Sequence, residues 1–142
     1  MGFFYVCVMK LRILLWNVGG ANDCEKRKVI KALIKDQKVD LVCLQETKMQ
    51  EMSKRIVRRL GVGRCLDWGV VNSRGAFGGV LVFWDNRVLQ LLEAEMGTFS
   101  VSCQFKSCED DFCWNFTGSM VTLQGLCSVF FLSRFWITFQ FF

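Results

Sequence analysis

The chain has 142 residues, of which 52% are hydrophobic, and a formal net charge of +5. This length is enough for one domain, and a mean hydropathy of +0.29 lies on the apolar side for a soluble protein. Histidine and proline are both absent, which excludes a catalytic histidine and every zinc site that pairs cysteine with histidine.

The basic residues crowd into the first half of the chain. Such an asymmetry is compatible with a polyanionic partner. Lysine-rich helix faces are also commonly just solvated, so both interpretations stay open.

The eight cysteines include no CxxC pair. Cys103, Cys108 and Cys113 are evenly spaced, but they fall on two expected strands and their turn, which disfavours a zinc site. Cys43 is expected in the core. No secretory signal opens the chain, so we expect free thiols in a reducing compartment, the nucleus or the cytoplasm.

Two apolar runs in the first third of the chain predict buried strands, LRILLW at 11–16 and LVCL at 41–44. Between them, Asn22 and Glu25 form a start that resembles a capping box. Apolar residues then recur at helical spacing, and the helix is basic around the rest of its surface. The apolar positions are Val29, Ile30, Leu33 and Ile34, and the basic ones are Lys26, Arg27, Lys31 and Lys35. This order predicts a βαβ unit with parallel strands.

A polar side chain follows each of these two strands. Asn17 comes directly after the first, and Glu46 comes after the second and Gln45. Neighbouring strands lie roughly 5 Å apart, so we expect Asn17 and Glu46 side by side at the edge where open α/β sheets bind ligands. An amide oxygen beside a carboxylate suits Mg²⁺. In the alternative, Asn17 caps a turn and Glu46 is solvated.

A second helix is predicted after Lys48, ended by Gly61 and Gly63. Its apolar stripe is expected to be a packing face and consists of Met49, Met52, Ile56 and Leu60. Its basic stripe consists of Lys54, Arg55, Arg58 and Arg59. We expect these arginines to face solvent, with contact to a phosphate backbone as the alternative.

Further strands are predicted at 68–71, 78–84, 88–93, 99–105 and 112–117. Residues 72–77, including Arg74, read as a loop, and Gly78 and Gly79 permit close backbone approach. The last two strands form a hairpin around a polar turn at 106–111. Its acidic residues, Glu109, Asp110 and Asp111, are expected to be soluble turn residues and not a cation site.

The segment 121–142 departs from this pattern. It is close to membrane-spanning length, but Arg134 lies inside it and would cost about 3 kcal/mol at a bilayer centre. Three interpretations stay open: a tail anchor, a partly structured apolar tail, and translated sequence without a selected structure. A membrane partner is disfavoured but not excluded.

Three motifs resemble the amino-terminal half of the endonuclease/exonuclease/phosphatase superfamily, and in particular the endonuclease domain of non-LTR (LINE-type) retrotransposons. They are WNVGGAN at 16–22, LQETK at 44–48 and GGVLVFWDN at 78–86. The resemblance implies the N-terminal half of a DNase I-like, four-layered α/β sandwich and descent from a Mg²⁺-dependent phosphodiesterase. It also implies that Asn17 and Glu46 are metal-site residues.

The later motifs of this family do not occur in the chain. The family completes its site with a tyrosine in a YGP-like motif, an Asp and Asn in a GDFN-like motif, and an Asp-His pair. Here the sole tyrosine, Tyr5, precedes the domain, and Gly19 stands where some relatives carry an acidic residue. Because no catalytic set is complete and no general base is evident, we expect an inactive fragment.

The resemblance also divides the chain. We expect an apolar extension over 1–9, a truncated domain over 10–118 and a divergent apolar tail over 119–142. A sandwich without its partner sheet would leave one sheet face bare, and the lost burial would exceed the stability of a typical domain. The tail or a second copy of the chain is therefore expected to cover that face.

Two further functions stay open besides a nuclease relic. The first is a non-catalytic DNA-binding module, for which the candidate contacts are Lys48, Arg55, Arg58, Arg59 and Arg74. The second is a tail-anchored or self-associating protein.

Overall fold

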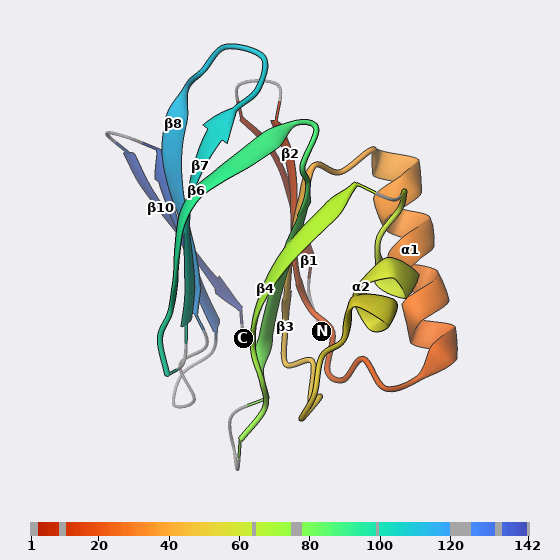
Figure 1. Cartoon of the computed structure of the whole chain (residues 1–142). Coiled ribbons are helices and arrows are strands. Elements are labelled where there is room, and N and C mark those ends of the chain that lie inside the picture. Colours follow the sequence, from red (N-terminus) through yellow and green to blue (C-terminus); the bar gives the residue numbers. More distant parts are fainter. Residues whose placement is uncertain are drawn as a thin grey trace.

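The computed structural model describes residues 3–8, 11–63, 65–74, 78–98, 100–119, 126–132 and 135–141. For 3–8, 119, 126–132 and 135–141 it describes the backbone alone. These residues form a helix layer and two stacked sheets, so the described part of the chain has three of the four layers that the family resemblance implies (Figure 1).

Each sheet has five strands. The first has the order β1-β2-β3-β5-β4, with bounds β1 Phe3–Val8, β2 Leu11–Asn17, β3 Leu41–Gln45, β5 Val80–Asp85 and β4 Leu66–Val71. The second has the order β10-β9-β8-β7-β6, with bounds β10 Phe135–Phe141, β9 Leu126–Leu132, β8 Cys113–Ser119, β7 Ser100–Ser107 and β6 Leu89–Met96. The helices are α1 Cys24–Gln37 and α2 Lys54–Leu60, and both cover the outer face of the first sheet.

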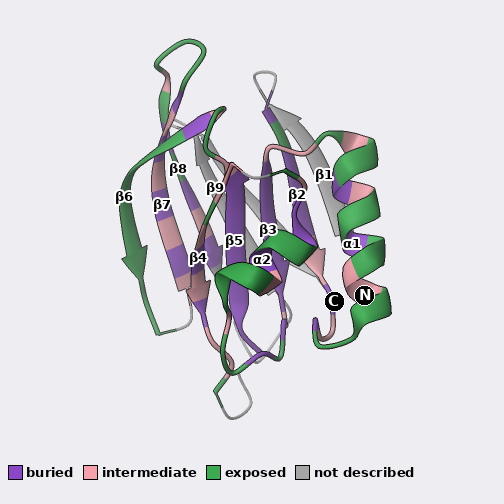
Figure 2. Ribbon diagram, turned by 45° about the vertical axis from the view of Figure 1, so that its right-hand side comes forward, coloured by how far each residue is buried: buried purple, intermediate pink, exposed green. Residues whose placement is uncertain are grey.

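The predicted βαβ unit is confirmed. β2 and β3 pair in parallel, from Ile13 opposite Leu41 to Asn17 opposite Gln45. Both strands, and β5 beside them, are buried on both faces (Figure 2), which explains why their sequences are continuous apolar runs rather than alternating ones. The extension at the amino terminus adds β1 as an antiparallel edge strand on β2.

Alternate residues of the central strands divide between two cores. On the helix side, strand residues such as Leu14, Val42 and Phe83 pack with Ile30 and Ile34 of α1. Between the sheets, the aromatic rings of Trp84, Phe105 and Trp114 dominate. The Trp84 and Phe105 ring centroids are 4.9 Å apart in an edge-to-face arrangement, and the Phe105 and Trp114 centroids are 5.2 Å apart.

The expectation of a bare sheet face is wrong. The hairpin of β7 and β8 is itself the partner sheet, because inward-facing Val101, Cys103 and Phe105 alternate with more exposed residues along β7. The tail extends this sheet, since β9 pairs with β8 and β10 with β9. The tail is therefore partly structured, and no helix in the described ranges is long and apolar enough to cross a membrane.

Both helices start later than predicted. The N-cap of α1 is Asp23, whose Oδ1 accepts from Glu25 N at 2.9 Å, while Asn22 Nδ2 donates to Lys48 O. The N-cap of α2 is Ser53. Residues 49–53 are not helical because Lys48 has a left-handed backbone and Met49 O is bound by Ser73 N.

The predicted packing faces need two corrections of detail. Val29 on α1 is 58% exposed, whereas Ile30 and Ile34 are buried. Met49 is buried, although it precedes the helix. In the first sheet, β5 begins at Val80 and not at Gly78, because Gly79 has a φ of +87° and interrupts the extended backbone.

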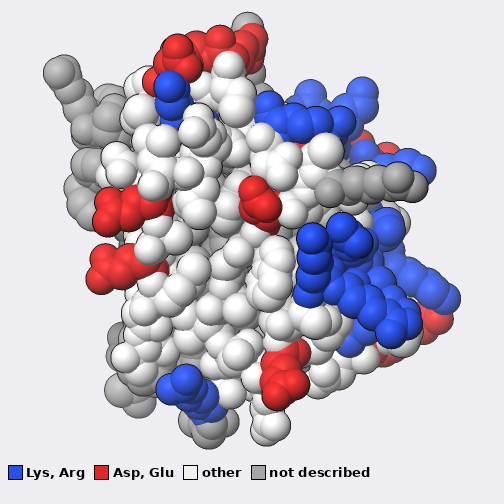
Figure 3. All heavy atoms as spheres, viewed as in Figure 1, with Lys and Arg blue, Asp and Glu red and all other residues white. Residues whose placement is uncertain are grey.

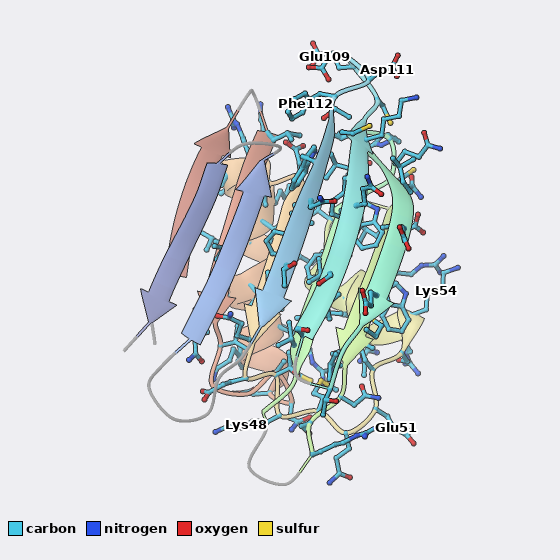
Figure 4. All side chains as sticks on the ribbon, turned by 90° about the vertical axis from the view of Figure 1, so that its left-hand side faces the viewer. Lys48, Glu51, Lys54, Glu109, Asp111 and Phe112 are labelled. Carbon is cyan, nitrogen blue, oxygen red and sulfur yellow. The ribbon has the colours of Figure 1, made fainter. Side chains whose placement is uncertain are left out.

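The predicted hairpin of β7 and β8 is confirmed, with its turn over 108–112 instead of 106–111, because Lys106 and Ser107 belong to β7. Glu109, Asp110 and Asp111 are exposed, and Asp111 pairs with Lys106 at 3.3 Å. The turn lies at the opposite end of the sandwich from Lys48 (Figure 4), so its carboxylates are remote from the end where Asn17 and Glu46 lie.

Candidate functional site

One end of the first sheet collects the polar loops, and we call it the site edge. β2, β3 and β4 run in the same direction and β1 and β5 run against them, so three strands end and two begin at this edge, at the bottom of Figure 1. The site edge consists of residues 17–22, 45–49, 72–74 and 78–79.

Backbone hydrogen bonds continue the pairing of β2 and β3 beyond the strands. Val18 N donates to Gln45 O at 3.0 Å, Gly20 N to Glu46 O at 2.7 Å, and Ala21 N to Thr47 O at 2.8 Å. The predicted juxtaposition of Asn17 and Glu46 at one sheet edge is therefore confirmed. Their role as metal ligands stays a prediction.

Glu46 occupies an unusual backbone conformation. Its φ is +53° and that of Lys48 is +55°, in the left-handed region that residues with a Cβ adopt at a cost. Gly78 makes room for the Glu46 side chain, because a Cβ on Gly78 would lie 3.0 Å from Glu46 Cα and 3.2 Å from Glu46 Cγ. The close approach predicted at Gly78 is confirmed.

Asn17 is half-buried, and its side chain already makes one local contact. Its Oδ1 accepts from Gly19 N at 3.2 Å, which is the turn geometry of the alternative interpretation. A carbonyl oxygen has two lone pairs, so this contact leaves the oxygen able to accept from a second partner. The turn therefore orients Asn17 without excluding a cation.

The loop after Asn17 is also held from the helix side. Lys26 Nζ donates to Val18 O at 2.8 Å, and Arg27 Nε donates to Ala21 O at 2.7 Å. The sequence analysis placed both side chains on the basic surface of α1, with solvation and contact to a polyanion both left open. They are instead half-buried, and the spacing of α1 gave no signal of these contacts.

Two more polar residues belong to the site edge and were not predicted as site residues. Gln45 is fully buried beside Asn17 in the strand register. Asn72 follows β4, and its Oδ1 is buried with no hydrogen bond from any described residue. The available signal was a polar residue directly after an apolar run, the same signal that identified Asn17.

The predicted nucleic-acid contacts fall into two groups. Lys48 and Arg74 are exposed on the site edge. Arg55, Arg58 and Arg59 are exposed on α2 in the helix layer. Figure 3 shows a basic surface over this layer. The α2 arginines therefore belong to the helix layer and not to the loops that carry Asn17 and Glu46.

The oxygen donors of the site edge, from Asn17 and Glu46, suit a hard cation but supply only a few of its ligands. An amide oxygen and a carboxylate match Mg²⁺, which takes one or two carboxylates and completes its shell with water and phosphate. Within the described ranges, no group of three or more Asp, Glu, Cys or His residues is placed to hold a metal ion. Burial raises the pKa of Cys43 far above its usual value and that of Cys103 to about 11, so these two core thiols stay protonated at neutral pH and are poor metal ligands.

Comparison with protein families matches residues 14–105 to the model described as the Endonuclease/Exonuclease/phosphatase family. Among solved structures, the chain is similar to the AP endonuclease LMAP from Leishmania major, with a TM-score of 0.56 and 19% sequence identity. The alignment covers 77% of this chain and 39% of that one, and at this identity it shows the fold alone. No curated protein matches the chain.

Proposed function

Because the chain belongs to the endonuclease/exonuclease/phosphatase family, we propose that its site edge binds nucleic-acid phosphate together with Mg²⁺ and that the chain hydrolyses it poorly or not at all. The finer assignment, descent from a LINE-type retrotransposon endonuclease acting on DNA, is part of this proposal. It is supported by three motifs at 16–22, 44–48 and 78–86, all of which lie inside the family match.

The observation that carries the proposal is the paired geometry of Asn17 and Glu46. Consecutive hydrogen bonds from Val18 N, Gly20 N and Ala21 N lock the two loops in register, so the two oxygen-bearing side chains stand on adjacent chains. Asn17 and Glu46 would hold the ion. When bound, Mg²⁺ would polarise a phosphoryl oxygen and neutralise charge there.

The remaining residues of the site edge supply binding rather than chemistry. Lys48 and Arg74 would contact phosphates on either side of the ion, since both side chains are exposed on this edge. The sequence contains no histidine, and its single tyrosine lies in β1. Glu46 is the one carboxylate among the site-edge residues, and the proposal assigns it to the ion. No second carboxylate, histidine or tyrosine of the site edge is left to activate water as a general base, so we expect weak hydrolysis.

A plasmid-nicking assay with Mg²⁺, run beside oligonucleotide binding, tests the proposal. We expect no nicking above background, and binding that Glu46→Ala and Lys48→Gln weaken. Lys28→Gln, on the exposed face of α1, is the matched control for loss of one positive charge. Nicking that Glu46→Ala abolishes would overturn the claim of poor hydrolysis, and binding unchanged by Glu46→Ala would overturn the assigned site.

A second candidate function is nucleic-acid binding by the helix layer. The observation in its favour is the exposed row of Arg55, Arg58 and Arg59 on α2. If these arginines bind phosphates, replacing all three by Gln reduces the slope of log affinity against log salt by about 0.9 for each lost contact on duplex DNA. If the slope of log affinity against log salt is unchanged in the triple variant, the α2 arginines do not contact phosphates and binding belongs to the site edge alone.

A further inference from the structure

We propose that Lys26 is a positioning residue that orients Asn17 through a single peptide unit, and that Arg27 fixes the far end of the same loop. The inference rests on the proposed function, because Asn17 matters for the metal only if the site edge binds one. It assigns a role to two side chains of α1 that the amino-acid pattern presents as ordinary solvated cations.

The loop between Asn17 and α1 needs external support. Gly19 and Gly20 have φ values of +60° and +113°, and consecutive glycines carry more conformational freedom than other residues. On the sheet side, this loop uses its N–H groups, since Val18 N donates to the last residue of β3, and Gly20 N and Ala21 N donate to the two residues that follow it. On the helix side, it uses its carbonyls.

The key contact is at the peptide between Val18 and Gly19. The Val18 carbonyl oxygen accepts from Lys26 Nζ at 2.8 Å, and the N–H of the same peptide unit, on Gly19, donates to Asn17 Oδ1 at 3.2 Å. A peptide unit is planar and rigid. Holding its carbonyl toward Lys26 therefore holds its N–H toward the side chain of Asn17.

The charge of Lys26 also strengthens this arrangement. A hydrogen bond from an ammonium group is stronger than one from a neutral donor, and hydrogen bonds in a chain polarise one another. The chain here runs from Lys26 Nζ through the peptide to Asn17 Oδ1. Arg27 Nε closes the loop at its other end, on Ala21 O at 2.7 Å.

The neighbouring lysine shows what an uninvolved cation of α1 looks like. Lys28 Nζ pairs with Glu25 at 3.0 Å, and its side chain is 74% exposed. Lys26 is half-buried and bound to a backbone carbonyl. Lys28 therefore provides a control of the same residue type on the same helix, with the same charge.

The test uses the full chain and Mn²⁺ alone as the probe, followed by NMR of the Asn17 side-chain amide and by hydrogen exchange of the Gly19 amide. We expect Lys26→Met to weaken Mn²⁺ binding by roughly 10-fold or more, the usual effect of removing a partner that orients a ligand, and to speed Gly19 exchange. Lys26→Arg is expected to keep both the Mn²⁺ affinity and the slow Gly19 exchange of the wild type, and Lys28→Met is expected to change neither the affinity nor the exchange rate. Lys26→Gln serves the same purpose if the Met variant folds poorly.

A double substitution separates positioning from general structural support. In an Asn17→Ala background, Lys26→Met should weaken Mn²⁺ binding no further, because its effect acts through Asn17. An equal loss in both backgrounds, or Gly19 exchange unchanged by Lys26→Met, would overturn the inference. If the wild-type chain shows no Mn²⁺ effect at Asn17, the proposed function fails, and the Gly19 exchange rates still decide whether Lys26 holds the loop.

Discussion

At the scale of single residues, Gly78 controls the position of Glu46. The Glu46 side chain packs where a Cβ on residue 78 would lie, and Glu46 itself has a left-handed backbone. Neither residue can therefore shift without moving the other. Glycine is needed at position 78 because a side chain there would meet Glu46, and not because of an unusual φ.

We predict that Gly78→Ala destabilises the chain by about 1–3 kcal/mol, the usual effect of overpacking, and weakens Mn²⁺ binding. Urea denaturation and Mn²⁺ titration measure the two effects. Gly97→Ala is the control, because its nearest neighbour is the hydroxyl of Ser100, a small side chain that can rotate away, in the turn between β6 and β7 of the second sheet. Equal stability of the two variants would contradict the assignment.

Residue types at the site edge could be predicted from the sequence, and the contacts between them could not. Asn17 and Glu46 were identified because each follows an apolar strand. Lys26 was not, because its contact joins a side chain to a backbone carbonyl eight positions earlier, across a loop of positive-φ glycines. Asp23, rather than Asn22, caps α1 for a similar reason, since Asn22 is used to hold Lys48.

At the scale of elements, the ends of β3 and β5 opposite the site edge hold two carboxylates in contrasting environments. Burial is the main reason that the pKa of Asp40 is raised, and the nearby Asp85 charge adds to it. Two hydrogen bonds from the Arg87 side chain to the Asp85 carboxylate are the main reason that the pKa of Asp85 is lowered. The two carboxyl groups should therefore affect stability in opposite directions as the pH changes.

For Asp40, the folded pKa lies above the unfolded one, so its contribution is largest below the unfolded value near 3.8 and is lost as the pH rises through the folded value. Asp85, with a lowered folded pKa, contributes stability above its unfolded pKa and loses it as the pH falls. We predict that Asp40→Asn becomes more stable relative to wild type as the pH rises toward 7, and Asp85→Asn less stable.

Urea midpoints measured between about pH 3 and pH 7 check these signs. Glu51→Gln, at an exposed position in the loop before α2, controls for the loss of one negative charge. Parallel pH profiles for the Asp40 and Asp85 variants would contradict the environments described for them.

Most strands could be predicted because their apolar runs are long and bounded by turn residues. The start of α2 could not, because Met49 and Met52 fit the helical period although they precede the helix. The left-handed backbone at Lys48 and the bond between Ser73 N and Met49 O override that period.

At the scale of the whole molecule, the sandwich depends on an aromatic centre shared by both sheets. Phe105 on β7 is fully buried and contacts Trp84 on β5 and Trp114 on β8. The sequence interpretation assigned these residues to strands correctly but missed that the strands of Phe105 and Trp114 belong to a second sheet. It treated the partner sheet as belonging entirely to the absent half of the family domain.

We predict that Phe105→Ala destabilises the chain by about 3–5 kcal/mol, as expected for a large cavity in a core. Leu91→Ala on the neighbouring strand β6, where the side chain is 36% exposed, should change stability by less than about 1 kcal/mol. Thermal or urea unfolding followed by circular dichroism compares the two variants. A Phe105→Ala variant as stable as Leu91→Ala would show that the sheets are not held together at this point.

The same aromatic centre gives the chain an intrinsic fluorescence signal for the packing of its two sheets. Trp84 and Trp114 are buried between the sheets, so their indole fluorescence should lie at short wavelengths in the native state and shift to the red when water enters. Trp16 and Trp68 pack on the helix side and are partly exposed. The intensity on the short-wavelength side of the emission spectrum should therefore fall when the two sheets separate. This measurement needs no added label.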